Sequence, residues 1–114
     1  MDFIWVYNIN QKKFVYASPG VERICGYSSK EVLAHGINGV VTAEFRSSIN
    51  QRIEEAVRLL QTNKVSEYVS KSEIKQPCAD GSSVWIEYNV KYRFNENGEI
   101  EAVGVSRNIE ERKR

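Results

Sequence analysis

The chain has 114 residues, of which 41% are hydrophobic and 27% are charged, and its net charge is +1. This length predicts one domain with a single core, and the near-neutral charge argues against binding to nucleic acid or a membrane surface through bulk charge. No apolar run reaches the roughly 18 residues that a membrane-spanning helix needs. The two cysteines, Cys25 and Cys78, fit no metal or redox spacing, which predicts reduced thiols and a cytoplasmic location.

Two short strands and a short helix are expected at the start of the chain. Residues 3–9 are rich in β-branched and aromatic side chains and predict a strand, and residues 14–17 predict a second strand that forms a hairpin with it. Ser18 followed by Pro19 is typical of a helix start, because Ser18 can accept a bond from a free backbone N–H group. This helix is expected to end near Gly26.

A capping box and an amphipathic pattern predict the next two helices. The side chains of Ser28 and Glu31 can each satisfy a backbone donor at the start of one helix, which is expected to end at Gly36. From residue 43 to residue 62 the apolar positions recur at steps of three and four. This spacing predicts one long helix that lies on a core and stops near Asn63.

Three further strands are expected in the second half of the chain. The first covers residues 66–76 and is very polar. Residues 84–92 alternate between apolar and mostly polar side chains, which is typical of a strand with one face on the core. Asn97 and Gly98 favour a hairpin turn into a third strand over residues 100–107. This order of elements predicts an α+β domain, with helices on one face of a single antiparallel sheet.

Several short motifs occur in an order that is characteristic of one family. They are SPGVERICGYS at residues 18–28, EVL at 31–33, DGSSVWIE at 80–87, NGE at 97–99 and GVSRNIEERK at 104–113. Together they make the sequence resemble the PAS family of sensor domains. That resemblance implies a five-stranded antiparallel sheet, helices clasping one face, and a small-molecule cavity between them. It also implies signal sensing or dimerisation inside a larger protein, usually a histidine kinase, a diguanylate cyclase or a transcriptional regulator.

The C-terminal segment is the expected output of such a domain. In relatives, the last strand ends in an Asp-Ile-Thr triplet that anchors a helix leading to the effector, and this chain has Asn108, Ile109 and Glu110 there. Asn108 can cap a helix as Asp does, although it lacks the charge for a strong ion pair. The resemblance implies a sensor domain over residues 1–109, the start of a connecting helix at 110–114, and an effector domain in the same chain. We expect these three residues to relay the signal.

The resemblance also implies a ligand site between the sheet and the helices. Alignment with flavin-binding relatives places four residues at ligand-contacting positions, and two isoleucines of the long helix are expected to close the far wall: Gln76, Ile86, Tyr88, Ser106, Ile49 and Ile53. The alternative is a packed core without a ligand. If Tyr88 and Ser106 are buried they need polar partners, which water or a polar ligand could supply.

The residues argue against two cofactors that relatives bind. Residues 37–46 lack the cysteine that flavin photosensors carry, and the long helix lacks the histidine that haem-binding relatives use. The single histidine, His35, is expected to face solvent or cap a helix rather than bind iron. Cys25 is expected to be a small buried hydrophobe, and Cys78 the more accessible thiol. No metal site is expected, and the cofactor stays unknown.

Catalysis and self-association are the competing functions. The chain has no phosphate-binding loop or metal-ligand spacing, and Glu54 and Glu55 are expected on a solvated helix face, so we expect no enzymatic activity in this segment. Trp85 is expected on the outer face of the sheet, and Trp5 is expected to point outward as well. Exposed aromatic residues are candidate contacts in a homodimer, and packing of Trp85 on the tail or on a neighbouring strand is the alternative. A ligand-free dimerisation module is therefore the second interpretation.

Overall fold

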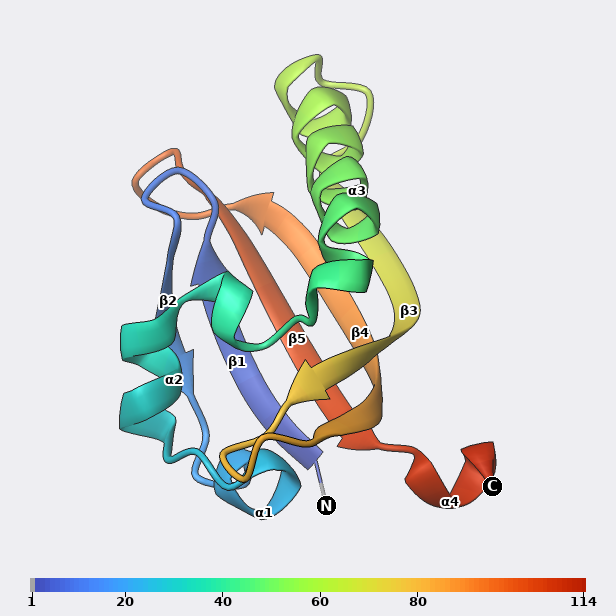
Figure 1. The fold of residues 1–114 in the computed structure, drawn as a ribbon. Coiled ribbons are helices and arrows are strands. Elements are labelled where there is room, and N and C mark those ends of the chain that lie inside the picture. Colours follow the sequence, from blue (N-terminus) through green and yellow to red (C-terminus); the bar gives the residue numbers. More distant parts are fainter. Residues whose placement is uncertain (1) are drawn as a thin grey trace.

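The computed structural model describes residues 2–114, which form one five-stranded sheet with helices packed on one face (Figure 1). The strands are β1 (Asp2–Asn8), β2 (Lys13–Ala17), β3 (Glu67–Pro77), β4 (Ser83–Phe94) and β5 (Ile100–Asn108). They lie in the order β2-β1-β5-β4-β3, and each neighbouring pair is antiparallel. This arrangement confirms the predicted α+β fold class.

The helices follow the predicted order. Between β2 and β3 the chain forms α1 (Val21–Cys25), α2 (Ser29–His35), the short 3₁₀ helix η1 (Ile37–Gly39) and α3 (Ala43–Gln61). A last short helix, α4 (Glu110–Lys113), follows β5. None of the helices within residues 2–114 is both long and apolar enough to cross a membrane.

Local signals in the sequence explain most of the helix ends. The predicted capping box is present, because the Ser28 side chain accepts from the Glu31 N–H and the Glu31 carboxylate accepts from the Ser28 N–H. Gly26 ends α1 with a φ of 83°, a conformation that glycine adopts without a Cβ clash. The prediction that Ser18 caps α1 is wrong. Its hydroxyl instead accepts from the Ile4 N–H of β1 at 2.8 Å, and Gly20 takes the cap position.

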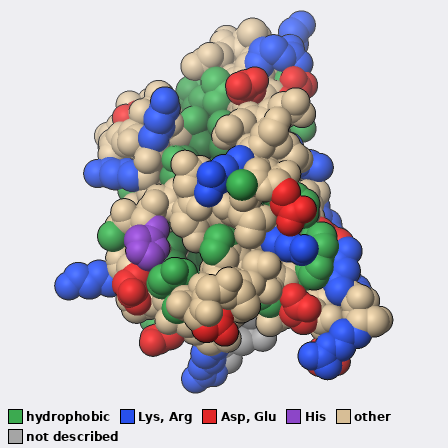
Figure 2. Space-filling model, viewed as in Figure 1, with side chains coloured by type: hydrophobic (Ala, Val, Ile, Leu, Met, Phe, Trp, Pro, Cys, Tyr) green, Lys and Arg blue, Asp and Glu red, His purple; other side chains and the backbone are tan. Residues whose placement is uncertain are grey.

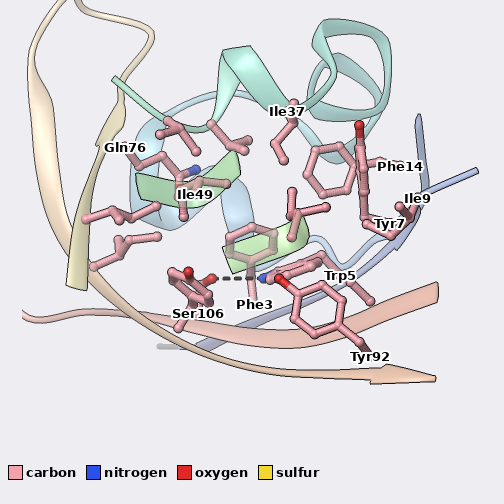
Figure 3. A pocket seen from close by; sticks show the side chains of 17 residues that line it. Phe3, Trp5, Tyr7, Ile9, Phe14, Ile37, Ile49, Gln76, Tyr92 and Ser106 are labelled. Atoms are coloured by element: carbon pink, nitrogen blue, oxygen red, sulfur yellow. Dashed lines mark hydrogen bonds between the residues drawn. The ribbon is translucent and has the colours of Figure 1, made fainter. Parts of the chain in front are cut away.

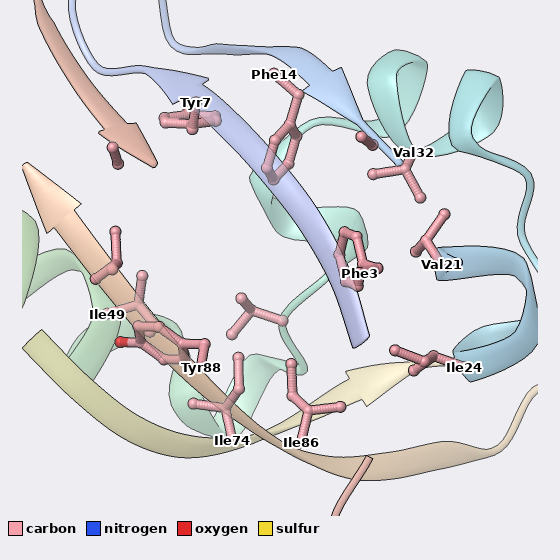
Figure 4. Packing of buried hydrophobic residues seen from close by; sticks show 14 of the residues in the cluster. Phe3, Tyr7, Phe14, Val21, Ile24, Val32, Ile49, Ile74, Ile86 and Tyr88 are labelled. Atoms are coloured by element: carbon pink, nitrogen blue, oxygen red, sulfur yellow. The ribbon is translucent and has the colours of Figure 1, made fainter. Parts of the chain in front are cut away.

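The core lies between the sheet and the helices. The alternating residues of β4 turn one face inward, where the predicted apolar set is buried: Val84, Ile86, Tyr88, Val90 and Tyr92. Figure 4 shows Ile86 and Tyr88 packed with Ile74 of β3 and Ile49 of α3, while Phe3 of β1 packs towards Val21 of α1. The core therefore lies on one face of the sheet, and part of the opposite face meets α4.

Candidate functional site

A cavity of about 60 Å³ lies between the inner face of the sheet, η1 and α3 (Figure 3). All the side chains that line it are uncharged, and most are aliphatic or aromatic. The six residues predicted to contact a ligand all lie on this wall: Ile49, Ile53, Gln76, Ile86, Tyr88 and Ser106. The volume is well below the roughly 300–1,000 Å³ that is usual for drug-sized ligands.

The cavity wall continues to the molecular surface as an apolar hollow. Figure 2 shows hydrophobic side chains between α3 and the turn that joins β1 and β2. Ile9, Ile37 and Ile53 line the cavity and are only partly buried. A small molecule could therefore enter beside α3 without unfolding of the sheet.

Trp5 lies on this wall, so the prediction that it points outward is wrong. Phe3, Trp5 and Tyr7 share the inner face of β1, because side chains two residues apart in a strand point to the same side. The Trp5 indole N–H donates to the Ser106 hydroxyl at 2.9 Å, and the indole ring meets the ring of Phe14 edge-on. Trp5 is thus a wall residue rather than a surface contact.

Gly104 of β5 makes the position of Trp5 possible. Trp5 and Gly104 are directly opposite each other in the β1–β5 ladder. A Cβ atom at residue 104 would overlap the six-membered ring of the indole. The absence of a side chain at Gly104 therefore lets the indole lie against β5 and reach Ser106, a requirement that the sequence pattern did not reveal.

Gln76 is the most polar group of the wall and is almost completely buried, with an exposed fraction of 1%. Its Nε2 atom donates to the Cys25 sulfur at 3.4 Å, and its Oε1 atom has no hydrogen-bond partner. An unpaired buried carbonyl costs roughly 1–3 kcal/mol. Such a group in a cavity wall indicates a place where a water molecule or a ligand donor would be stabilised.

Two buried tyrosines complete the floor of the site. Burial raises the pKa of Tyr88, while the Arg52 charge and the nearby Ser72 hydroxyl act in the opposite direction. No well-formed hydrogen bond reaches the Tyr88 hydroxyl. Burial also raises the pKa of Tyr92, so both phenols are neutral at physiological pH. Arg52 itself lies outside the cavity wall and donates to Ser70 at 3.0 Å.

The three predicted relay residues connect the end of β5 to β4. The Asn108 Oδ1 atom accepts from the Glu110 N–H at 2.8 Å, which stabilises the first turn of α4. Ile109 is buried, and its N–H donates to the Trp85 carbonyl at 3.0 Å. The Glu110 carboxylate accepts from the Trp85 N–H at 2.7 Å. Both backbone groups of Trp85 are therefore bonded to the segment that starts α4.

The outer face of β3 and β4 holds the last residues of α4. Glu73 and Glu87 are directly opposite each other in the ladder, an arrangement in which like charges repel. Arg112 Nη2 lies 2.8 Å from a Glu73 oxygen and 3.1 Å from a Glu87 oxygen, and Lys113 Nζ lies 2.6 Å from Glu73. We call Glu73, Trp85, Glu87, Arg112 and Lys113 the tail site.

The charges of the tail site favour its ionised form. A hydrogen bond from Lys113 lowers the pKa of Glu73, although the negative charge of Glu87 works against it. A hydrogen bond from Arg112 lowers the pKa of Glu87, and the charges of Lys71 and Arg107 add to the effect. Docking of α4 therefore relieves the repulsion between two facing carboxylates.

Trp85 is not a free surface group. It faces the outer side of β4 as predicted, but Lys113 Nζ lies 4.5 Å from its ring centroid and Phe45 of α3 meets the ring edge-on at 5.7 Å. The alternative in which Trp85 packs on the tail is the one that the structure supports. For Trp85 to act as a dimer contact, α4 would first have to leave the ring so that a second chain could pack there.

The cysteines and the histidine lie where they were expected. Cys25 is buried and Cys78 is half-buried, and burial raises the pKa of the Cys78 thiol. His35 is exposed and meets the ring of Tyr27 edge-on. Within residues 2–114 no group of three or more histidine, cysteine or acidic residues is arranged to hold a metal ion.

Solved structures similar to this chain include PAS domains and sensor proteins. The N-terminal domain of a diguanylate cyclase with PAS/PAC sensor from Marinobacter aquaeolei matches with a TM-score of 0.75 and 16% identity over 100% of both chains. A PAS domain from Colwellia psychrerythraea matches with a TM-score of 0.70 and 22% identity over 96% of this chain and 87% of that one. A sensory box histidine kinase/response regulator from Burkholderia thailandensis matches with a TM-score of 0.67 and 21% identity over 99% and 80%.

Identities this low establish the fold alone, and the family is established by sequence. No curated protein shows a significant match to this sequence. The family model for the PAS domain matches residues 1–111, nearly the whole chain. The inward Trp5, the cavity behind it and the helix that follows β5 all lie within or beside that match, and the chain belongs to the PAS domain family.

Proposed function

We propose that this PAS domain binds a small molecule in the cavity and relays the binding event to α4. The observation that carries the proposal is the unpaired Oε1 atom of Gln76, in a side chain that is 1% exposed on the cavity wall. A packed core with no ligand function gains nothing from an unsatisfied carbonyl. A sensing cavity does, because the free acceptor makes occupancy favourable.

Strand β4 supplies a short route from the cavity to the tail site. Ile86 and Tyr88 point into the cavity, while Trp85 and Glu87 point to the other side and contact α4. Consecutive residues of a strand point to opposite faces, so a shift of β4 on one face moves the other. On β5, Ser106 lines the cavity only two residues before Asn108, where the relay segment begins.

Helix α3 supplies a second route. Ile49 and Ile53 line the cavity, and Phe45 lies one turn earlier on the same helix, where it contacts Trp85. If a ligand moves α3 away from the sheet, Phe45 moves with it and the packing around Trp85 changes. Both routes converge on Trp85, which is bonded to Ile109 and Glu110.

The output of the proposed sensor is an effector domain in the same chain. Histidine kinases and diguanylate cyclases are the effector types named for the similar solved structures. Asn108, Ile109 and Glu110 would pass the change in docking to the connecting helix. We assign no catalytic activity to the domain itself, and we place it in the cytoplasm because both of its cysteines are free thiols.

Native mass spectrometry of the purified domain tests the ligand proposal directly. The expected result is a second mass that is lost when the same sample is measured under denaturing conditions, and its difference from the apo mass gives the mass of the ligand. If the protein purifies without a ligand, the cavity is probed by adding small aromatic molecules. If none of these molecules shifts the Trp5 indole N–H signal in a ¹H–¹⁵N spectrum, the proposal is contradicted.

A homodimerisation module is the second candidate, and one surface favours it. The outer face of β1, β2 and β5 carries five adjacent apolar residues: Ile4, Val6, Tyr16, Val103 and Val105. Ile4 is 48% exposed and lies opposite Val105, which is 38% exposed. Contiguous exposed apolar side chains on a sheet face are typical of an interface, here with a second copy of the chain.

The oligomeric state tests this second candidate. Sedimentation analysis of the domain is expected to show a concentration-dependent dimer that the Val105→Lys variant abolishes. Val69 is 62% exposed on β3, outside the five-residue patch, so Val69→Lys is the matched control. A monomer at every concentration, or equal loss of the dimer in both variants, would argue against a dimer through the five-residue patch.

A further inference from the structure

The hydrogen bonds around Gln76 fix the orientation of its amide group. The Cys25 thiol donates its proton to the Val21 carbonyl, with 3.4 Å between sulfur and oxygen. The Cys25 sulfur can therefore act only as an acceptor towards Gln76. Nε2 is the amide atom with protons, so it must face the sulfur, and Oε1 is the atom left free. A ligand for this position has to bring a hydrogen-bond donor.

The remaining wall fixes the charge of the ligand. All of the lining side chains are uncharged, and the three tyrosines among them, Tyr7, Tyr88 and Tyr92, are held neutral by the burial that raises each pKa. The charge of Arg52 acts on Tyr88 and Tyr92, yet Arg52 is not part of the wall and its guanidinium group donates to Ser70. An ionised ligand would lose its hydration without gaining a counter-ion, which is strongly unfavourable.

The size and shape of the wall set the third requirement. The volume of about 60 Å³ is smaller than the roughly 150 Å³ of an engineered cavity that binds benzene, so a one-ring ligand requires a small outward movement of α3 and a multi-ring cofactor a much larger one. The rings of Trp5 and Phe14 stand at 89° to each other, which forms an aromatic corner beside the Ser106 hydroxyl. Aromatic walls favour a flat apolar body through edge and face contacts.

We propose that the cavity takes a neutral, largely apolar molecule about the size of one aromatic ring, which carries one O–H or N–H donor bonded to Gln76 Oε1. The inference rests on the proposed function, because it specifies the ligand of the same cavity. It assigns Gln76 as the group that selects for a donor, and Trp5 and Phe14 as the surfaces that hold the ring.

Phenol and toluene test the donor requirement, because they differ only in a hydroxyl and a methyl group. Both are titrated into the purified domain, and the Trp5 indole N–H signal in ¹H–¹⁵N spectra reports occupancy. Benzoate is the charged probe. We expect phenol to bind, benzoate to bind at least about tenfold more weakly than phenol, and the phenol-to-toluene affinity ratio to fall about tenfold in Gln76→Met.

Gln61→Met is the matched control, because Gln61 is exposed at the end of α3 and outside the cavity wall. This variant is expected to keep the wild-type ratio. An unchanged ratio in Gln76→Met, or binding of toluene or benzoate but not phenol, overturns the donor and charge assignment and leaves ligand sensing standing. Absence of binding by all three probes to the folded domain contradicts ligand sensing itself.

Discussion

The two tryptophans of the chain lie on opposite faces of the sheet, in surroundings of opposite character. Trp5 lines the inner cavity, where every neighbouring side chain of the wall is uncharged. Trp85 lies in the tail site, where Lys113 and Lys75 stand near its ring and Glu110 binds its backbone. The cavity depends on packing and on two hydrogen bonds, from Trp5 to Ser106 and from Gln76 to Cys25, whereas the tail site depends on ion pairs.

This difference means that the two regions respond to different perturbations. Contacts between uncharged groups are little affected by salt, while exposed ion pairs are screened by it. A larger side chain on β5 is expected to alter the packing of the cavity. A change of side-chain charge on β3 is expected to alter the docking of α4. The proposed relay is the link between the two, so each region can be altered separately and the effect on the other can be measured.

Filling the space at Gly104 is expected to have the largest effect. In Gly104→Ala the new methyl group would overlap the Trp5 indole, and overpacking of this kind costs roughly 1–3 kcal/mol. We expect the free energy of unfolding in urea to fall by about 2 kcal/mol and the Trp5 indole signal to move. The double variant with Trp5→Leu is the control. There the alanine should cost much less, and an equal cost in both backgrounds would show that Trp5 is not the obstacle.

Removing one carboxylate of the tail site is expected to have an intermediate effect. Glu73→Gln deletes the partner of Lys113 and one of the two partners of Arg112, so the backbone amides of α4 should exchange with solvent several-fold faster. Glu67→Gln is the matched change on β3, because Glu67 pairs with Lys91 and makes no ion pair with α4. Equal exchange rates in the two variants would mean that the ion pairs do not hold α4.

Salt and acid are expected to release α4 in the unaltered domain. The Debye length falls from about 8 Å at 0.15 M salt to about 3 Å at 1 M, which weakens the exposed pairs. The pKa values of Glu73 and Glu87 are lowered in the folded state. Their contribution is therefore complete above the ordinary glutamate pKa of about 4.3 and is lost as the pH falls through the lower folded values.

The fluorescence of Trp85 measures this release in a Trp5→Phe variant, where it is the only indole. We expect its emission to change between 0.15 M and 1 M salt, and again on acidification below about pH 4. In the Glu73→Gln variant the salt response should be smaller. If salt leaves the emission unchanged, the ion pairs of the tail site do not control the packing of α4 on Trp85.

The smallest expected effect is a gain in stability in Gln76→Met. Methionine has a similar length and removes the unpaired Oε1 atom, so the free energy of unfolding should rise by up to about 1 kcal/mol. The indole N–H signal of Trp85 in a ¹H–¹⁵N spectrum should not shift, since the substitution does not alter the tail site. A loss of 2 kcal/mol or more would show that Gln76 is well hydrogen-bonded in solution and that the free acceptor does not exist.

Periodic patterns allowed the fold and much of the cavity to be predicted. The alternation in β4 placed Ile86 and Tyr88 on the inner face, and the helical spacing of residues 43–62 placed Ile49 and Ile53 opposite them. The same reasoning failed for Trp5. Its neighbours Ile4 and Val6 are also apolar, so the alternation of β1 does not show which face is buried.

Packing of Trp85 on the tail was one of two alternatives, but the ion pairs of the tail site could not be predicted, because they depend on strand register. Glu73 and Glu87 are 14 positions apart, and only the β3–β4 ladder places them opposite each other. The role of Gly104 depends in the same way on its pairing with Trp5 across the β1–β5 ladder. A sequence pattern gives the face of each strand, whereas contacts between strands require the alignment of one against the next.

The most direct test of the relay observes both indole N–H signals while the cavity is filled. The chain has two tryptophans, so a ¹H–¹⁵N spectrum contains one indole signal from the cavity and one from the tail site. During a titration with phenol, we predict that the Trp5 signal and the Trp85 signal shift with the same midpoint, and that the Ile109 amide exchanges at a different rate at saturation. A shift of Trp5 with Trp85 and Ile109 unchanged would contradict the relay and leave a cavity that binds without signalling.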